Sequence, residues 1–264
     1  AHVGKWHRQV SMLSFEKIEA FREKGADVDF GAFGENLVVE GFDLSKVPVG
    51  TKFQIGEAIL ELTQIGKECH SHCAIYKVMG DCIMPREGVF TKVLKGGEIK
   101  AGDEITMLPL EKDRPFTAAV ITLSDKGAAG EREDKSGPLI QEMLMKEGYD
   151  VIETLLLPDG EQPLKHQLMR LADQRQVNVI FTTGGTGFAE RDVTPEATQA
   201  VCDRMAMGIA DAIRQYSLSI TGRAMLSRAV SGIRKKTLIV NLPGSPKAVK
   251  ESLEIGRASC RERV

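Results

Sequence analysis

The sequence lacks any apolar run that approaches the roughly 20 residues needed to span a bilayer, and no signal peptide is recognisable. Charge of one sign is also missing, since 35 Lys and Arg stand against 37 Asp and Glu, with no dense basic block. These absences argue against a membrane protein and against a nucleic-acid-binding protein. The five cysteines are an odd number, which argues against a disulfide framework and predicts a reducing, cytoplasmic setting.

The two ends of the chain suggest that the natural protein is longer. The first segment, AHVGKWHRQVSML, starts at Ala1 without a methionine, and we expect native sequence to be missing before it. Residues 256–264 read GRASCRERV, which has no apolar period, so we expect a foreign tail there and draw nothing from Cys260. The 264 residues suffice for one large domain or two ordinary ones.

Residues 8 to about 108 contain short apolar runs separated by Gly or Pro: RQVSML, ENLVVEGF, TKFQIG, AILELTQIG, FTKVL and DEITMLPL. Strict alternation in AILELTQI is typical of a half-buried strand, and SFEKIEAFREKG predicts one small helix. The pattern predicts a mostly β, barrel-like domain over residues 1–112. Pro109, the charged EKD segment and Pro115 predict a linker where this rhythm ends.

Residues 113–255 alternate between apolar strands and helices. TAAVITL, DVIETLLL, VNVIFTT and TLIVNL are each followed by a helical pattern. Continuous apolar strands joined by helices predict an α/β domain of three layers, with a mostly parallel sheet buried on both faces. Ligands of such sheets bind beyond the carboxyl ends of the strands.

Four loops leave those carboxyl ends, and all are rich in Gly, Ser or Asp: SDKGAAGEREDKSG, LPDGEQ, TTGGTGFAERDVTPEA and NLPGSP. Glycine lets backbone amides approach an anion, and helix N-termini favour negative charge. Ser136 and Ser245 are predicted helix caps, with Pro246 at the first helical position. The standard nucleotide motifs are absent, because Glu190 stands where a Rossmann fingerprint needs glycine and no P-loop occurs.

Three carboxylates accompany these loops. Asp159 and Asp192 follow strands that we expect to be neighbours in the sheet, and Asp125 follows the first strand. Carboxylates beside a phosphate site are suited to Mg²⁺, and Asp159 and Asp192 are the predicted metal ligands. The alternative is that both are ordinary turn residues. Arg191 and Arg228 are candidates for stabilising phosphate charge, the alternative being that they are simply solvated.

Six ordered motifs over residues 117 to 255 resemble the MogA/MoaB family of molybdenum-cofactor biosynthesis. They are LSD, DKSG, LLLPDGEQ, TTGGTGFAERDVTPEA, LSRAVSGIR and NLPGSPKAVKE. The resemblance implies a molybdopterin adenylyltransferase, which joins AMP from ATP to the terminal phosphate of molybdopterin with Mg²⁺. It implies catalytic roles for Asp159 and Asp192. It also implies ligand-binding roles for Ser136, Gly184, Gly185, Thr186, Gly187, Ser231, Asn241, Pro243, Gly244 and Ser245.

A second resemblance concerns the first domain. GAFGENLVVEGFD, VPVGTKFQIGEAILELTQ and VLKGGEIKAGDEI are similar to the MOSC domain, in which Cys69 matches the characteristic cysteine. The resemblance implies a sulfur carrier or cofactor ligand at Cys69, near Lys67, His70 and His72. The alternatives are a structural cysteine, or zinc bound by the stretch CHSHC, which lacks the second cysteine pair of a structural zinc site.

The two resemblances together predict a fused protein of cofactor biosynthesis that handles molybdopterin and works with other biosynthesis proteins. Two other functions remain open at this point. The α/β domain could carry molybdopterin without adenylating it, or sulfur transfer through Cys69 could be the main activity. The MogA/MoaB resemblance further implies a possible homotrimer.

Overall fold

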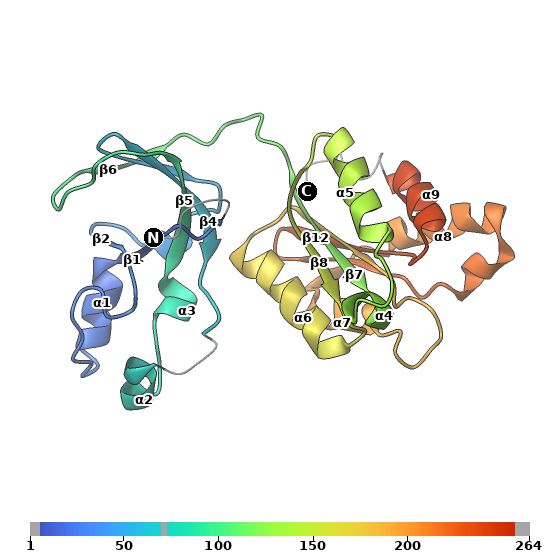
Figure 1. Ribbon diagram of the computed structural model, residues 1–264, viewed down its shortest axis with the longest axis horizontal. Helices are drawn as coiled ribbons and strands as arrows, with labels where there is room; N and C mark the ends of the chain where they lie inside the picture. Colours follow the sequence, from blue (N-terminus) through green and yellow to red (C-terminus); the bar gives the residue numbers. More distant parts are fainter. Residues whose placement is uncertain (1–5, 70–72, 257–264) are drawn as a thin grey trace. The chain divides into compact units, whose positions relative to one another are not determined.

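The structure is a computed structural model that describes residues 6–69 and 73–256. The chain divides into two compact units, Ala1–Asp113 and Arg114–Val264, drawn in blue to green and in green to red in Figure 1. None of the helices in the described ranges is both long and apolar enough to cross a membrane.

The first unit is built on one six-stranded sheet in the order β2-β1-β5-β4-β3-β6, in which only the β1–β2 pair is parallel. Each strand overlaps one of the six apolar runs of the sequence, and β1 and β5 extend beyond their runs by one residue at one end or at both ends. Their bounds are β1 Val10–Ser14, β2 Leu37–Val39, β3 Lys52–Ile55, β4 Ala58–Ile65, β5 Val89–Lys95 and β6 Ile105–Leu108. The predicted small helix is α1, Phe15–Arg22.

This sheet separates two hydrophobic clusters, as strand alternation requires. Met12 and Val89 belong to one cluster, whereas their neighbours Leu13 and Phe90 belong to the other. The sheet curls (Figure 1), but β2 and β6 stand at its two edges and do not pair with each other among the described residues. The expected barrel is therefore an open half-barrel. Two short helices, α2 (Ala74–Met79) and α3 (Met84–Glu87), precede β5.

The second unit contains a six-stranded sheet in the order β10-β11-β12-β9-β7-β8. The strands β12, β9, β7 and β8 are parallel to one another, whereas β11 and β10 form an antiparallel extension next to β12. The sheet is thus mostly parallel, as predicted. Its strands are β7 Thr117–Leu123, β8 Asp150–Leu157, β9 Val179–Thr183, β10 Arg204–Met205, β11 Ser231–Arg234 and β12 Thr237–Leu242.

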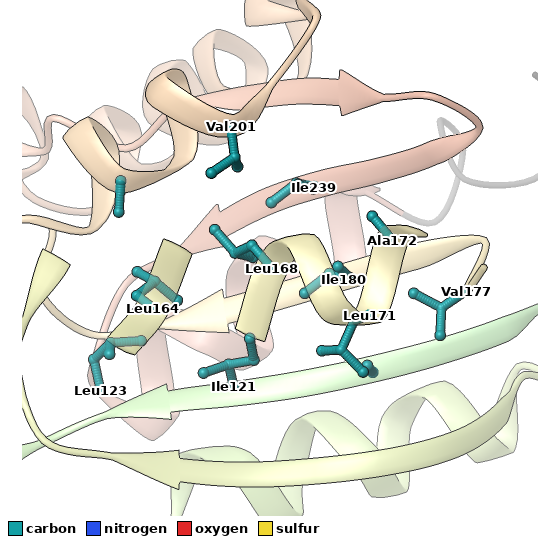
Figure 2. Packing of buried hydrophobic residues seen from close by; sticks show 12 residues of the cluster. Ile121, Leu123, Leu164, Leu168, Leu171, Ala172, Val177, Ile180, Val201 and Ile239 are labelled. Atoms are coloured by element: carbon teal, nitrogen blue, oxygen red, sulfur yellow. The ribbon is translucent and has the colours of Figure 1, made fainter. Parts of the chain in front are cut away.

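Helices cover both faces of this sheet, which explains the continuous apolar strands. In β7, Ala119, Ile121 and Leu123 pack against one helical layer, and Ala118 and Val120 against the other. The first layer consists of α6 (Glu161–Met169), the π-helical turn η2 (Arg170–Gln174) and α7 (Thr194–Val201); Figure 2 shows this side of the core. The second consists of α5 (Ser136–Lys146), α8 (Met207–Ile220) and α9 (Pro246–Gly256).

One part of this unit differs from the sequence prediction. The helical pattern that follows VNVIFTT forms α7, which ends at Val201, and β10 follows at the edge of the sheet. The sequence reading missed α8, the turn η3 (Gly222–Leu226) and β11, which together form the excursion between β10 and β12.

Candidate functional site

The four loops of interest leave one edge of the parallel sheet. Thr183 of β9 pairs in register with Thr122 of β7 and with Leu242 of β12, and Leu123 pairs with Leu157 of β8. The four strands therefore end at nearly the same level. The loops that follow them meet at the carboxyl edge, where ligands of parallel sheets bind.

Asp125 and Asp159 are joined at this edge by a reciprocal pair of hydrogen bonds. The backbone N–H of Asp159 donates to Asp125 Oδ1 at 2.9 Å, and the N–H of Asp125 donates to Asp159 Oδ2 at 3.3 Å. Burial raises the pKa of the Asp159 carboxyl, and the charges of Asp125 and Asp192 raise it further. Three acidic side chains thus share one site.

The strand order corrects one expectation about these carboxylates. Asp159 follows β8 and Asp192 follows β9, which were predicted to be neighbours, but β7 lies between these strands. Asp125, which follows β7, therefore comes between the other two in strand order. Their charges still interact because the loops converge beyond the strands.

Asp192 is held in the loop between β9 and α7. Its Oδ2 accepts a hydrogen bond from Ala189 N at 3.0 Å. A Cβ at Gly187 would lie 2.8 Å from the same oxygen, so glycine is required there for this placement of Asp192. The Asp192 carboxylate is thus positioned by the backbone N–H of Ala189 and by the space that Gly187, which has no side chain, leaves for it.

Arg228 holds this loop in place, whereas the sequence suggested that it could stabilise phosphate charge. Its Nε donates to Gly187 O at 2.6 Å, its Nη2 donates to Asp192 O, and its Nη1 forms an ion pair with Glu196. Its backbone N–H also donates to Thr186 O at 3.0 Å. The guanidinium therefore holds the Asp192 loop in place, instead of extending free toward a phosphate. Arg191 is exposed.

The glycines at the start of the loop permit close contacts of backbone. Gly184 and Gly185 have φ values of 96° and 63°, in the left-handed region that favours glycine. Gly184 lies against Gly244, where an added Cβ would be 3.3 Å from Gly184 Cα. Thr194, the first residue of α7, fixes the turn by donating from Oγ1 to Gly184 O at 2.9 Å. Thr186 is buried beside it.

A pocket of about 740 Å³ lies between the starts of α5 and α9, and Thr122, Ser124, Gly184, Gly244 and Ser245 are among its lining residues. Asp125, Asp159 and Asp192 are outside this lining, so the described site has a carboxylate cluster and a separate hollow.

The residues that cap the two helices of this pocket differ in part from the prediction. Ser245 caps α9 by accepting from Ala248 N at 3.3 Å, and Pro246 is the first helical residue, as predicted. Ser136 does not cap α5. Its Oγ donates instead to Gly244 O at 2.9 Å. Asp134 takes the capping role, since its Oδ1 accepts from the backbone N–H groups of Ser136 and Gly137 at 2.9 and 3.0 Å.

Three residues expected to bind ligand have structural partners. Asn241 is fully buried, donates to Thr182 and Thr198 at 2.9 Å each, and accepts from Val230 N. In this structure the side-chain amide of Asn241 is therefore bonded to protein groups on both its oxygen and its nitrogen.

Ser231 is also fully buried, donating to Ala206 O at 2.6 Å and accepting from Ala210 N in the first turn of α8. It too is a structural residue. Pro243, the residue after β12, accepts a hydrogen bond at its carbonyl oxygen from Thr183 Oγ1 at 2.7 Å, which connects the end of β9 to the loop after β12.

The first unit has its own hollow of about 620 Å³, lined in part by Cys69, Cys73, Cys82, Arg8 and Lys67. Cys69 and Cys73 are exposed, whereas Cys82 is buried, and burial raises the pKa of the Cys82 thiol. His70 and His72 lie outside the described residues. Within residues 6–69 and 73–256, no group of three or more His, Cys, Asp or Glu side chains is placed to hold a metal ion.

Sequence comparison now identifies the domain that carries the carboxylate cluster. The family described as "Probable molybdopterin binding domain" matches residues 119–256, about half of the chain. The chain belongs to this family. The MOSC domain family matches residues 1–106, so both resemblances seen in the sequence are confirmed.

Curated relatives agree with this assignment. The molybdopterin adenylyltransferase of Haemophilus influenzae is 44% identical over 137 residues, which cover 51% of this chain and 70% of the relative. The enzyme of the same name from Escherichia coli K12 is 43% identical over 138 residues, with the same coverage. The Drosophila melanogaster molybdenum cofactor synthesis protein cinnamon is 39% identical over 141 residues, but only 23% of its length is covered.

Solved structures show the same fold for the molybdopterin-binding domain. The molybdopterin biosynthesis enzyme MoaB from Thermus thermophilus is 45% identical with a TM-score of 0.51, covering 53% of this chain and 89% of that structure. A molybdopterin biosynthesis protein from Mycobacterium abscessus is 35% identical with a TM-score of 0.53, covering 55% and 91%.

Three residues of this site were not identified from the sequence: Asp134, Thr122, and Arg228 in its bracing role. Asp134 could have been found, because an Asp just before a predicted helix start is a common capping signal. The contacts of Arg228 join segments far apart in the sequence, and no local pattern marks Arg228 or Thr122.

Proposed function

We propose that this chain is a molybdopterin adenylyltransferase of molybdenum-cofactor biosynthesis, acting through residues 113–255 in a cytoplasmic setting, with residues 1–112 as a MOSC domain that handles the same cofactor. The carboxylates of Asp125, Asp159 and Asp192 beside the glycine loop carry this proposal. The names of relatives at 43–44% identity support it.

In the proposed reaction an oxygen of the terminal phosphate of molybdopterin attacks the α-phosphorus of ATP. The bond from the α-phosphorus to the oxygen that bridges to the β-phosphorus breaks, and pyrophosphate leaves. No side-chain nucleophile is required, so the protein acts by positioning the two phosphates and by controlling charge. Asp192, placed by Ala189 and Arg228, and Asp159, paired with Asp125, are the residues we assign to this task.

The donor set suits Mg²⁺ bound jointly with substrate. Mg²⁺ in nucleotide sites is usually held by one or two carboxylates together with substrate phosphates and water. A complete cage of protein ligands is therefore not needed, in agreement with the lack of one among the described residues. Burial is the main cause that raises the pKa of Asp159, and the charges of Asp125 and Asp192 raise it further; a cation would offset both effects. Mg²⁺ would supply charge neutralisation, with Asp159 and Asp192 as ligands.

The deciding experiment is pyrophosphate release from ATP and Mg²⁺ in the presence of molybdopterin. Asp192→Asn should abolish turnover while the variant still binds the pterin. Asp150→Asn, an exposed aspartate at the opposite end of β8, is the matched control and should turn over like the parent. Molybdopterin binding without pyrophosphate release by the parent chain would indicate a carrier and refute the enzyme.

A second candidate function rests on the cysteine-lined hollow of the first unit. We propose sulfur or cofactor handling there by Cys69, which is exposed and lines the hollow together with Lys67. Trapping a persulfide on Cys69 with an alkylating reagent would support it. Persulfide recovered equally from Cys69→Ser would assign the sulfur to another thiol.

Self-association is proposed from exposed apolar side chains on α8 and η3. Tyr216, Leu218, Ile220 and Met225 are between 42% and 67% exposed. Surfaces of this kind mark interaction sites when they are contiguous. A homotrimer is the expected state, and sedimentation equilibrium at the mass of a monomer would refute it.

A further inference from the structure

Three cysteines line the hollow of the first unit, and they differ in exposure. Cys69 and Cys73 are exposed, whereas Cys82 is buried, with 6% of its surface accessible. A buried cysteine usually serves as a small apolar residue, and Cys82 does belong to a hydrophobic cluster. Because Cys82 also lines the hollow, its sulfur is placed to react with a group that Cys69 carries.

The segments that carry Cys69 and Cys82 are joined at one junction. The backbone N–H of Gly66 donates to Gly88 O at 2.6 Å, and a Cβ at Gly66 would overlap Pro85 O. Gly66 has a φ of 72°, so both its conformation and this close approach require glycine. Cys69 follows Gly66 closely in the chain, and Cys82 closely precedes Pro85. Both cysteines therefore extend from the same fixed point.

Cys82 is held firmly beside this junction. Its backbone N–H donates to Asp81 Oδ1 at 2.8 Å, and Arg86 donates to both carboxylate oxygens of Asp81 at 2.9 and 2.8 Å. The hydrogen bonds from Arg86 and from the Cys82 N–H lower the pKa of Asp81 to about 2, so this carboxylate is ionised at neutral pH. The protein therefore fixes the backbone at Cys82 before any reaction.

The environment of the three thiols sets the order in which they react. Burial raises the pKa of the Cys82 thiol, and the charge of Cys69 raises it further, with a smaller contribution from Cys73. The Cys82 thiol therefore stays protonated at neutral pH and is shielded from reagents in solution. Exposed Cys69 meets a sulfur donor first, and Cys82 can act only afterwards, on a group inside the hollow.

Two cations lie on one wall of this hollow. The Arg8 guanidinium lies 5.7 Å from the centre of the Phe90 ring, and the Lys67 ammonium lies 5.8 Å from the same centre. Arg8, Lys67 and Phe90 all line the hollow, and Glu68 is the opposing charge among the described lining residues. The net positive lining suits an anionic sulfur species such as hydrosulfide.

We propose that Cys82 resolves a persulfide formed on Cys69, by attacking the Cys69 sulfur and releasing the outer sulfur into the hollow as sulfide. The proposal rests on the sulfur-handling function proposed above for Cys69. Cys82 is then a catalytic residue, because its sulfur bonds to a reacting atom. The hollow becomes a site that converts persulfide sulfur into sulfide.

The two steps balance without an added oxidant. First, the Cys69 thiolate takes the outer sulfur of a low-molecular-weight persulfide, and the donor leaves as a thiolate. Next, the Cys82 sulfur bonds to the inner sulfur on Cys69, and the persulfide S–S bond breaks. The outer sulfur leaves as hydrosulfide and takes the proton of Cys82. The two cysteine sulfurs are oxidised to a disulfide while the outer sulfur is reduced, and a dithiol reductant then restores both thiols.

The test mixes the full reduced chain with glutathione persulfide in the absence of other thiols. The parent should release sulfide in a stoichiometric amount, above the background set by Cys69→Ser. Peptide sequencing by mass spectrometry should then find Cys69 and Cys82 joined by a disulfide. Such a bond requires Cα atoms no more than about 7 Å apart, so the linked peptide tests the geometry directly. A disulfide between Cys69 and Cys73 instead would overturn the proposal.

Cys82→Ala removes the resolving sulfur and keeps an apolar residue in the core cluster. Persulfide should accumulate on Cys69, where an alkylating reagent traps it, and sulfide release should fall at least about tenfold, because an intramolecular reaction is lost. Cys73→Ser, which changes an exposed thiol of the same hollow, is the matched control and should release sulfide like the parent. Unchanged release by Cys82→Ala, or loss of release only in Cys73→Ser, would overturn the proposal.

These measurements separate the role of Cys82 from the sulfur-handling function of Cys69. Persulfide that accumulates on Cys69 of the parent without release of sulfide would keep that function and refute the role of Cys82. Neither persulfide on Cys69 nor sulfide, in the parent and in Cys82→Ala alike, would refute both. The disulfide in the parent is detected without any substitution, so the proposal stays testable even if Cys82→Ala fails to fold.

Discussion

Replacing Arg228 by lysine should separate the placement of Asp192 from the stability of the domain. The guanidinium of Arg228 contacts Gly187 O, Asp192 O and Glu196, and a lysine ammonium can reach one of these at a time. The variant therefore loses two hydrogen bonds at a half-buried position. At about 0.5–1.5 kcal/mol each, the free energy of unfolding should fall by about 1–3 kcal/mol. For a domain of this size, that corresponds to a fall in the melting midpoint of about 5 °C.

The expected effect on turnover is larger than the effect on stability. Arg228 holds both ends of the segment from Gly187 to Asp192, and a misplacement of about 1 Å near a reacting group can cost about 100-fold in rate. The kcat for pyrophosphate release should fall by about that factor well below the melting midpoint. The KM for ATP should change less, because Arg228 is committed to protein groups.

A matched control and a double variant test the reasoning. Arg234 makes a similar set of contacts, to Asp173 and to Val201 O at 2.8 Å, at a different part of the domain. Arg234→Lys should lose similar stability with unchanged kcat. In an Asp192→Asn background, Arg228→Lys should have little further effect on turnover. Full additivity of the two changes, or parent-like kcat in Arg228→Lys, would refute the bracing role.

Three further substitutions follow from the geometry. Asp159→Asn should raise the free energy of unfolding at pH 7. The pKa of Asp159 is higher in the folded state than its ordinary value of 3.8, so the parent loses stability as the pH rises from below 3.8 through the folded-state pKa. The stability gained by Asp159→Asn should therefore vanish in thermal melts near pH 3. Asn241→Ala should cost about 3 kcal/mol in urea unfolding by removing three buried hydrogen bonds, and a loss below 1 kcal/mol would contradict its structural role. Gly187→Ala should displace Asp192 and lower kcat by more than tenfold. Gly208→Ala, at a glycine with open space around it, should have the kcat of the parent. Equal kcat values for the two variants would show that a side chain at residue 187 does not displace Asp192.

Local patterns predicted most of the elements because secondary structure depends on short-range periodicity. The six apolar runs of the first domain each overlap one of its six strands, and the four apolar runs of the second contain its four parallel strands. The Ser245 cap and Pro246 were predictable because capping involves residues a few positions apart. The segment that contains β10, α8 and β11 was not predicted, because its helix and short strands lack strong start and stop signals in the sequence.

The sequence predicted which loops carry the candidate site residues, but not how the individual side chains are oriented. The sequence predicted acidic residues and glycines at the carboxyl ends of parallel strands, and the comparisons confirmed the family. Whether a side chain faces ligand or protein could not be predicted. Asn241 and Ser231 resemble binding residues in the sequence, yet they bind buried backbone and side-chain partners.

The sequence by itself determined the two domains with their different strand and helix patterns, the parallel strands, and the loops rich in glycine and aspartate that follow them. Each of these features is encoded by residues that are close together in the chain. Only the tertiary structure decided that β7 lies between β8 and β9, that Asp125 pairs with Asp159, and that Arg228 braces the Asp192 loop. It also buried the Thr122 hydroxyl without a hydrogen-bond partner among the described residues. The physical reason is that strand order and side-chain partners depend on contacts between residues tens of positions apart, which no local pattern records.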